Sequence, residues 1–274
     1  ADDPSANSDV SNTAYDGNAM AAIPLVWVKR WQEDGYQYVS FCEVQYDAGY
    51  KAYAHTRPDG SIAAKAYHAM FKGGLVGGKL RSLKDLWQEN NTNAQQELDY
   101  AKANGSEWNI RTWSLHELIA DLLTLISKNM NAQAAFGSGC TTGYVDDASQ
   151  HYGQLKGGSL FSKGQFYGAG PSDTRTQVKV FHIEGFWGER WDRLAGLIYE
   201  NGVWKAKMTG EGGGYNLTGA GYTAVCHGVP HSGTDSFGGW QKEVRQTEFG
   251  RFPVGELTGG DQSYEADYHW VNNH

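Results

Sequence analysis

The first part of the chain alternates apolar and polar residues in a pattern that predicts antiparallel strands. Residues 25–31 and 36–42 are rich in β-branched and aromatic residues, and residues 66–71 form a weaker third segment. The four residues between the first two segments end in Asp34-Gly35, a step typical of a two-residue hairpin turn. The pattern therefore predicts a β-hairpin over residues 25–42.

Two segments with helical periodicity follow. The first covers about residues 93–104, and Gly105 stands where a left-handed C-terminal cap is expected. The second begins at Ser114 to Glu117, which fits a capping box. Its apolar residues recur at helical spacing and predict one buried face: Leu115, Leu118, Ile119, Leu122, Leu123 and Ile126. Glu117, Asp121 and Lys128 are expected on the solvated face of this helix.

After residue 136 the pattern changes to short aromatic-rich stretches separated by glycines, which predicts short strands joined by shaped loops. Residues 178–183 and 187–198 are the clearest strands, and Asn201-Gly202 predicts a hairpin over residues 199–204. Residues 1–20 are small, polar and acidic instead. They predict a flexible N-terminal arm before a single domain over residues 21–274.

Composition then limits the class of protein. The 274 residues include 36 Gly, 10 Trp, 16 Tyr and 10 Phe. This aromatic content excludes a disordered chain. Glycine does not recur at every third position, which excludes collagen. The net charge is −8 and no basic run occurs, so a nucleic-acid partner is not expected. No apolar stretch is long enough to span a membrane, so membrane insertion is not expected either.

Cysteines and histidines give no sign of a metal site. The cysteines are odd in number, lie far apart and form no CxxC pair, so we expect free thiols: Cys42, Cys140 and Cys226. His227 and His231 have the spacing of metal ligands on a helix, but Gly228 and Pro230 break helical geometry. No calcium-loop pattern accompanies Asp146-Asp147 or Asp261. The expectation is no metal and no cofactor.

Motifs of catalysis are also missing. The sequence holds no phosphate loop, no dinucleotide fingerprint and no nucleophile elbow, and Cys140 has no neighbouring base. Glu184 and Glu189 flank Trp187, and paired acids beside tryptophan are typical of glycosidases. A hydrolase acting on glycans through these two acids is therefore the alternative to a protein without enzymatic activity.

The aromatic and glycine-rich stretch over residues 210–240 favours recognition. Trp and Tyr supply large, rigid contact area, while Gly, Ser and Asn supply adaptable loops. We expect six residues of this stretch to contact a receptor or ligand: Tyr215, Tyr222, His227, His231, Phe237 and Trp240. Tyr222 and Trp240 are expected to be the anchors among them. At least half of the aromatic rings of the chain are expected in its core instead.

A family resemblance is carried by five segments, residues 23–30, 50–55, 113–139, 180–196 and 259–270. These segments resemble tail-associated structural proteins of bacteriophages and prophages, of the C-type-lectin-like group that includes the formylglycine-generating enzyme fold. The resemblance extends over roughly residues 20–270. It implies an α+β domain in which two helices pack on a twisted antiparallel sheet with extensive Gly- and Trp-rich loops. The Gly238-Gly-Trp240 stretch partly matches a segment that this group carries near its C-terminus.

The resemblance also implies a function. It indicates a non-enzymatic virion protein, such as a tail fibre, receptor-binding or adhesin component, that recognises or positions a host-surface receptor, either protein or glycan. The expected partners are that receptor, other virion subunits and further copies of the chain, a trimer being common among such fibres. The expected location is the phage particle surface; a secreted or cell-surface location is the alternative, and an architectural adaptor or head decoration protein is a further reading.

Two departures from the group bear on activity. Formylglycine-generating enzymes place two cysteines close together in the C-terminal core, where this chain has Cys226 alone, so oxidase activity is not expected. Sugar-binding C-type lectins carry Glu-Pro-Asn or Gln-Pro-Asp calcium motifs, and neither tripeptide occurs. Calcium-dependent sugar binding is therefore not expected.

Overall fold

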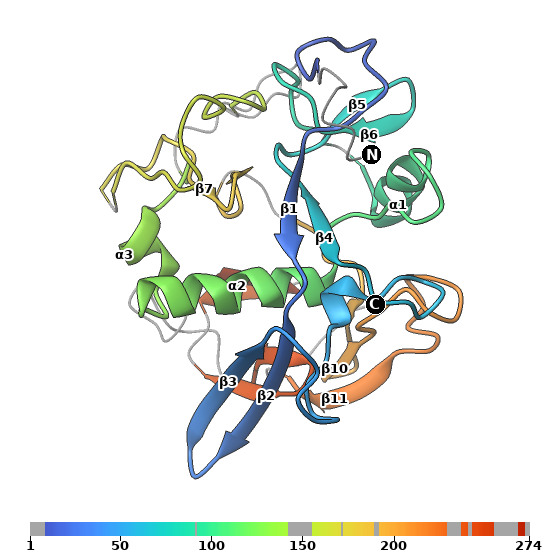
Figure 1. Ribbon diagram of the computed structural model, residues 1–274, viewed down its shortest axis with the longest axis vertical. Helices are drawn as coiled ribbons and strands as arrows, with labels where there is room; N and C mark the ends of the chain where they lie inside the picture. Colours follow the sequence, from blue (N-terminus) through green and yellow to red (C-terminus); the bar gives the residue numbers. More distant parts are fainter. Residues whose placement is uncertain are drawn as a thin grey trace. The chain divides into compact units, whose positions relative to one another are not determined.

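The protein is a mixed α/β structure with small antiparallel sheets, as a computed structural model shows (Figure 1). It describes residues 9–90, 92–141, 155–170, 172–188, 192–228 and 243–254, and the backbone of residues 237–240 and 268–271. The α+β class predicted from the sequence is confirmed at this level. The strands pair in sheets of two or three within the described chain, and the C-type-lectin-like arrangement stays a prediction.

Contacts divide the chain into two compact units, and each unit is built from three separate segments. Unit 1 comprises residues 1–23, 67–109 and 136–191, and unit 2 comprises residues 24–66, 110–135 and 192–274. The boundary falls within two paired strands, β1 and β4. The single domain predicted over residues 21–274 stays a prediction, because a division by contacts does not by itself define independently folding domains.

Unit 1 combines short strands with one helix. Its elements, including the two strands shared with unit 2, are β1 (Met20–Pro24), β4 (Lys65–Ala69), β5 (Gly74–Val76), β6 (Lys79–Arg81), α1 (Ala94–Lys102), β7 (Lys179–Val180) and β8 (Ile183–Glu184). A small core cluster is formed by Val10, Ala19, Phe71 and Leu83. Asn93 caps α1 in a reciprocal capping box with Gln96, close to the predicted start. Gly105 has φ +149, so it lies outside the left-handed helical region predicted for it.

Residues 9–19 belong to the arm expected from the sequence, and they are bound to unit 1. Val10 is buried, and its carbonyl accepts a hydrogen bond from the Lys84 amide at 2.6 Å. The Arg81 guanidinium donates to the Gly17 carbonyl at 2.6 Å. Polar composition suggested flexibility, but two buried apolar residues, Val10 and Ala19, and hydrogen bonds to backbone carbonyls hold this stretch in place. Residues 1–8 lie outside the described chain.

Unit 2 holds the longest helix and most of the strands. Its elements are β2 (Trp27–Glu33), β3 (Tyr36–Cys42), a 3-10 turn η1 (Tyr53–His55), α2 (Trp113–Ser127), most of α3 (Ala132–Phe136), β9 (Leu197–Glu200), β10 (Val203–Ala206), β11 (Thr223–His227), β12 (Phe237–Trp240), β13 (Val244–Thr247), β14 (Gly250–Pro253) and β15 (Tyr268–Val271). Strands β9, β10 and β11 form a three-stranded sheet. Its core centres on Trp113, Trp204 and Phe252, and each indole N–H donates to a backbone carbonyl.

Two predicted hairpins are confirmed and one predicted strand is wrong. Asp34-Gly35 and Asn201-Gly202 form the turns of β2–β3 and β9–β10, with positive φ at both positions of each turn. Residues 178–183 were expected as one strand. They form instead the β7–β8 hairpin, whose turn residues Phe181 and His182 have φ +49 and +66. Of the strand expected over residues 187–198, only the end joins β9, and residues 189–191 lie outside the described chain.

The predicted second helix exists, but its start and its charged face differ from the prediction. Thr112, not Ser114, caps α2, and its hydroxyl accepts from the Leu115 amide at 3.3 Å. Glu117 and Asp121, expected in solvent, are only 4% and 3% exposed. Ile126, expected in the core, is exposed with Leu125. The helix therefore buries acids on one side because arginines from distant strands reach them.

Candidate functional site

The outward side of the β2–β3 hairpin carries a cluster of aromatic rings. Side chains alternate between the two sides of a strand, and the register places Lys29 opposite Ser40 and Trp31 opposite Tyr38. We define the aromatic face as five side chains of this side together with two tyrosines of the next loop: Lys29, Trp31, Tyr36, Tyr38, Ser40, Tyr46 and Tyr50. Trp27, Glu33 and Cys42 share this side of the hairpin but are not part of the definition. Figure 1 shows β2 and β3 side by side as a long ribbon.

The rings of the aromatic face contact one another and remain open to solvent. Trp31 and Tyr38 are stacked with ring centroids 4.9 Å apart and planes within 10°. The ring centroids of Tyr36 and Tyr38 lie 6.5 Å apart, and those of Tyr46 and Tyr50 lie 6.2 Å apart. Tyr36 is 68% exposed and Tyr46 is 78% exposed. Rings so exposed contribute little to folding, and contiguous exposed apolar area of this kind marks binding sites.

Polar contacts hold the loop after β3 on the aromatic face. The Tyr50 hydroxyl lies 2.8 Å from the Ser40 hydroxyl, and Lys29 Nζ lies 3.0 Å from Asp47 Oδ2. This ammonium group also lies 5.9 Å and 5.7 Å from the ring centroids of Trp31 and Tyr50. The hydrogen bond from Lys29, followed by that from the Gly49 amide, lowers the pKa of Asp47. These contacts hold Tyr50 and Lys29 in place on the aromatic face.

The opposite side of the hairpin is anchored by a buried group of charges on α2. Arg30 Nε lies 2.7 Å from Asp121 Oδ2, and Arg251 Nη2 lies 3.3 Å from Asp121 Oδ1. The Arg251 backbone amide donates to Glu117 Oε2 at 2.8 Å. A Cβ at Gly250 would come within 2.5 Å of the same Glu117 oxygen, so this strand can approach the helix only with glycine there. The two arginines and two acids balance in charge.

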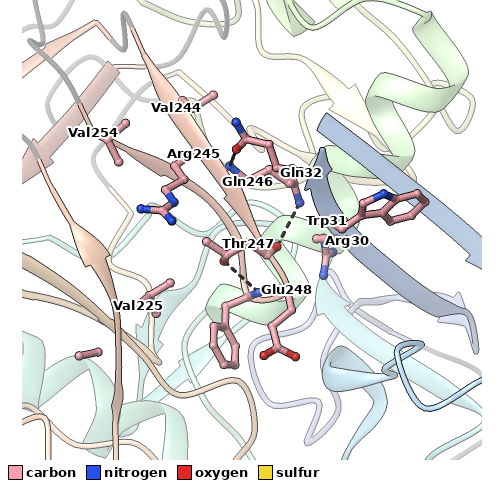
Figure 2. Close-up of a pocket in the computed structure, with 12 residues that line it drawn as sticks. Arg30, Trp31, Gln32, Val225, Val244, Arg245, Gln246, Thr247, Glu248 and Val254 are labelled. Atoms are coloured by element: carbon pink, nitrogen blue, oxygen red, sulfur yellow. Dashed lines mark hydrogen bonds between the residues drawn. The ribbon is translucent and has the colours of Figure 1, made fainter. Parts of the chain in front are cut away.

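An open cavity of about 740 Å³ borders the edge of β2 in the same unit (Figure 2). The Gln246 backbone amide donates to Gln32 Oε1 at 3.2 Å, and the Gln37 side-chain amide donates to the Val244 carbonyl at 3.2 Å. The side-chain amides of Gln32 and Gln37 therefore join the hairpin to β13. Figure 2 shows the Trp31 ring directed away from Arg245. The lining mixes apolar, amide, guanidinium, hydroxyl and carboxylate groups, and its hydroxyl, that of Thr247, donates to the Gly250 carbonyl at 3.2 Å.

The structure places the recognition residues predicted from the sequence in different settings. Tyr215 is buried, and burial raises the pKa of its hydroxyl, so its ring packs inside unit 2. Tyr222 is half-buried and donates to the Asn216 carbonyl at 3.0 Å, which closes the loop over residues 216–222. His227 is exposed at the end of β11. His231 and the side chains of Phe237 and Trp240 lie outside the described residues.

Glu184, one acid of the predicted hydrolase pair, serves the packing of unit 1. It is 2% exposed, and its carboxylate accepts hydrogen bonds from the amides of Gly158 at 2.9 Å and Leu160 at 3.2 Å. Its cross-strand neighbour Lys179 donates to the Leu160 carbonyl at 2.8 Å. Burial raises the pKa of Glu184 and lowers that of Lys179. Glu189 lies outside the described residues, so the separation of the pair is not defined.

The remaining chemical candidates form no reactive cluster among the residues that the structure describes. Cys42, Cys140 and Cys226 are free thiols, as predicted. Within the described ranges, no three of His, Cys, Asp and Glu come together as metal ligands. Asp146-Asp147, Asp261 and His231 fall outside these ranges. No helix among the described residues is sufficiently long and apolar to cross a bilayer.

The aromatic face was not singled out from the sequence, although a signal for it was present. The Asp34-Gly35 turn fixes the register, and that register alone places Trp31 opposite Tyr38 and Glu33 opposite Tyr36. Pairing the residues of the two strands outward from this turn places the Trp31, Tyr36 and Tyr38 rings on one side of the hairpin. Comparisons of the chain with protein-family models and with curated protein sequences found no match.

Proposed function

We propose that this chain is a non-enzymatic bacteriophage virion protein that attaches to a receptor on the host surface, and that the aromatic face is its contact surface. The resemblance of its segments to tail-associated phage proteins supports the virion setting. The observation that carries the attachment function is the set of rings exposed on a hairpin that Arg30 anchors to α2. Such rings supply large contact area at low entropic cost, because each Tyr or Trp side chain has only two rotatable bonds.

The internal contacts of the hairpin favour binding over catalysis. Reactive groups near the aromatic face are engaged: Lys29 is paired with Asp47, and Arg30 with Asp121. Glu184, the acid that sequence analysis offered for hydrolysis, holds backbone amides in unit 1. Proposed partners are the receptor, other virion subunits and further copies of the chain. In the architectural alternative, another virion subunit covers the aromatic face.

The virion setting is tested by immunogold labelling of intact phage particles with antibodies against this chain. Gold at the particle surface is the expected result. Particles that lack the chain in both immunogold images and immunoblots would remove the virion assignment. Labelling that appears only after the particles are dissociated would favour the architectural alternative.

The attachment surface is tested with the full chain, fluorescently labelled, on a panel of bacterial strains. We expect binding to at least one strain and a loss of about tenfold in affinity for the Tyr36→Ala/Tyr46→Ala double variant, because two exposed rings are removed. Tyr67→Ala, which removes an exposed tyrosine from β4, is the matched control. Equal binding of the double variant and the wild type would show that the aromatic face is not the contact surface.

A further inference from the structure

We infer that the aromatic face binds an uncharged carbohydrate chain, whose pyranose rings stack against the aromatic rings. This inference rests on the proposed function, because it names the chemistry of the receptor bound at the same surface. It is carried by the geometry of the rings, by their polar atoms and by the local balance of charge.

The rings of the aromatic face are turned in different directions. Trp31 and Tyr38 stack on each other with planes within 10°, whereas the planes of Tyr36 and Tyr38 differ by 54° and those of Tyr46 and Tyr50 by 75°. The C–H side of a pyranose carries partial positive charge and is attracted to the negative face of an aromatic ring. Ring faces that no neighbouring ring covers can therefore each hold one sugar unit.

The polar tips of the rings suit sugar hydroxyls. Among the residues that the structure describes, nothing hydrogen-bonds to the Trp31 indole N–H or to the hydroxyls of Tyr36, Tyr38 and Tyr46. A tyrosine hydroxyl both donates and accepts, as a sugar hydroxyl does, and the indole N–H donates. Ser40 and Tyr50 add two further hydroxyls beside them. The face thus alternates stacking area with hydrogen-bonding groups.

Charge on and around the face disfavours an anionic ligand. Its single cation, Lys29, is paired with Asp47, and the surrounding Glu33, Asp34 and Glu43 are exposed acids. The whole chain has a net charge of −8. A polyanion such as nucleic acid or an acidic polysaccharide would need unpaired Lys or Arg side chains here. Neutral sugars face no such repulsion.

The small extent of the face separates a glycan from a protein partner. A standard protein–protein interface involves about 20–30 residues per side with an apolar centre. The aromatic face offers far fewer side chains, from one hairpin side and one loop, with hydroxyls between the rings. A narrow, extended ligand matches this strip better than the broad surface of a folded protein.

The test is affinity electrophoresis of the full chain in native gels that contain dextran, mannan, galactomannan or mixed-linkage β-glucan, with a heparin gel for comparison. We expect retardation in at least one of the four neutral gels and none in heparin. The Tyr36→Ala/Tyr46→Ala variant should lose about tenfold in apparent affinity, whereas Tyr67→Ala should migrate like the wild type. Circular dichroism of each variant checks that the fold is kept.

Parallel binding to bacterial cells separates failure of this inference from failure of the proposed function. Ring-dependent cell binding that is lost after periodate treatment of the cells supports a glycan. Ring-dependent cell binding without retardation in any neutral gel, or with loss only after protease treatment, overturns the glycan and keeps the attachment function. Retardation in heparin alone also overturns it. Cell binding that does not depend on the rings overturns both.

Discussion

Asp121 is the residue at which the hairpin, the helix and a distant strand meet. Its carboxylate lies between the guanidinium groups of Arg30 and Arg251 and is almost fully buried. Removal of one partner from a buried charge group leaves the others without compensation in a region that water does not reach. Asp121 therefore matters more to stability than an acid in a surface pair.

Replacement of Asp121 by Ala is expected to lower the free energy of unfolding by about 3–5 kcal/mol, because two buried arginines lose their shared anion. Urea denaturation followed by tryptophan fluorescence measures the change. Asp47→Ala, which breaks the surface pair with Lys29, is the control and should change stability much less. A small effect of Asp121→Ala, similar to that of the control, would contradict a structural role for the buried group.

His55 is the residue that should give unit 2 a pH dependence. It is 2% exposed, and neither ring nitrogen has a hydrogen-bond partner among the described residues. Burial lowers its pKa from 6.5 to about 4. As pH falls below 6.5 the unfolded chain takes up a proton there, while the folded chain does so only near pH 4. Folding must therefore keep the His55 imidazole neutral, and this lowers the free energy of unfolding more and more as pH falls from 6.5 to about 4.

We expect the free energy of unfolding to fall between pH 6.5 and about 4, and the His55→Leu variant to fall less over the same window. Urea titrations at pH 7.5, 6.5, 5.5 and 4.5 would measure both slopes. If His55→Leu and wild type follow parallel curves, His55 does not titrate differently in the folded chain.

At the scale of elements, the turns determine which hairpins could be foreseen. Asn201-Gly202 has φ +50 and +79, and its residue types suit those angles, as do those of Asp34-Gly35. The β7–β8 turn uses Phe181 and His182 at positive φ, which their side chains disfavour, so the sequence offers no turn signal there. The Phe181 ring packs edge-on against the Phe166 ring, with ring centroids 5.0 Å apart, while the Phe181 backbone has positive φ.

Two reciprocal substitutions test the turn energetics. His182→Gly should stabilise the chain by about 1 kcal/mol, because glycine adopts positive φ without strain and His182 is exposed. Gly202→Ala should destabilise by about the same amount, because its φ of +79 strains any residue with a Cβ, while nothing in the described chain beyond its two neighbours lies within 4 Å of that Cβ. Thermal unfolding measures both. Opposite signs are expected, and a destabilising His182→Gly would point to an unseen contact of the imidazole.

Helices show what local pattern can and cannot determine. Periodicity located α1 and α2, because it depends on neighbours within the same helix. The burial of Asp121 and Glu117 depends on partners 91 and 134 positions away, Arg30 and Arg251, which no local pattern contains. For the same reason the sequence drew attention to residues 210–240, where aromatic composition is conspicuous, and missed the rings of the hairpin, which only the register brings together.

At the scale of the whole molecule, the net charge and the neutral aromatic face lead to one expectation about binding. A ligand held by ring stacking and hydroxyl contacts should bind with little dependence on salt, because no counterions are released. Affinity for the neutral polysaccharide that binds in native gels should change less than about twofold between 50 and 500 mM NaCl, as measured by titration of tryptophan fluorescence. A steep decline with salt would indicate ionic recognition.

The rings of the aromatic face come from a single stretch between Lys29 and Tyr50, whereas each compact unit draws on three distant segments. None of the rings belongs to the core clusters around Phe71 or Trp204. Under the proposed function, the codons that determine specificity therefore lie in one short stretch of the gene. Changes to the exposed rings of this stretch would alter which surface is recognised, provided that Arg30 in the same stretch is kept to anchor the hairpin to α2.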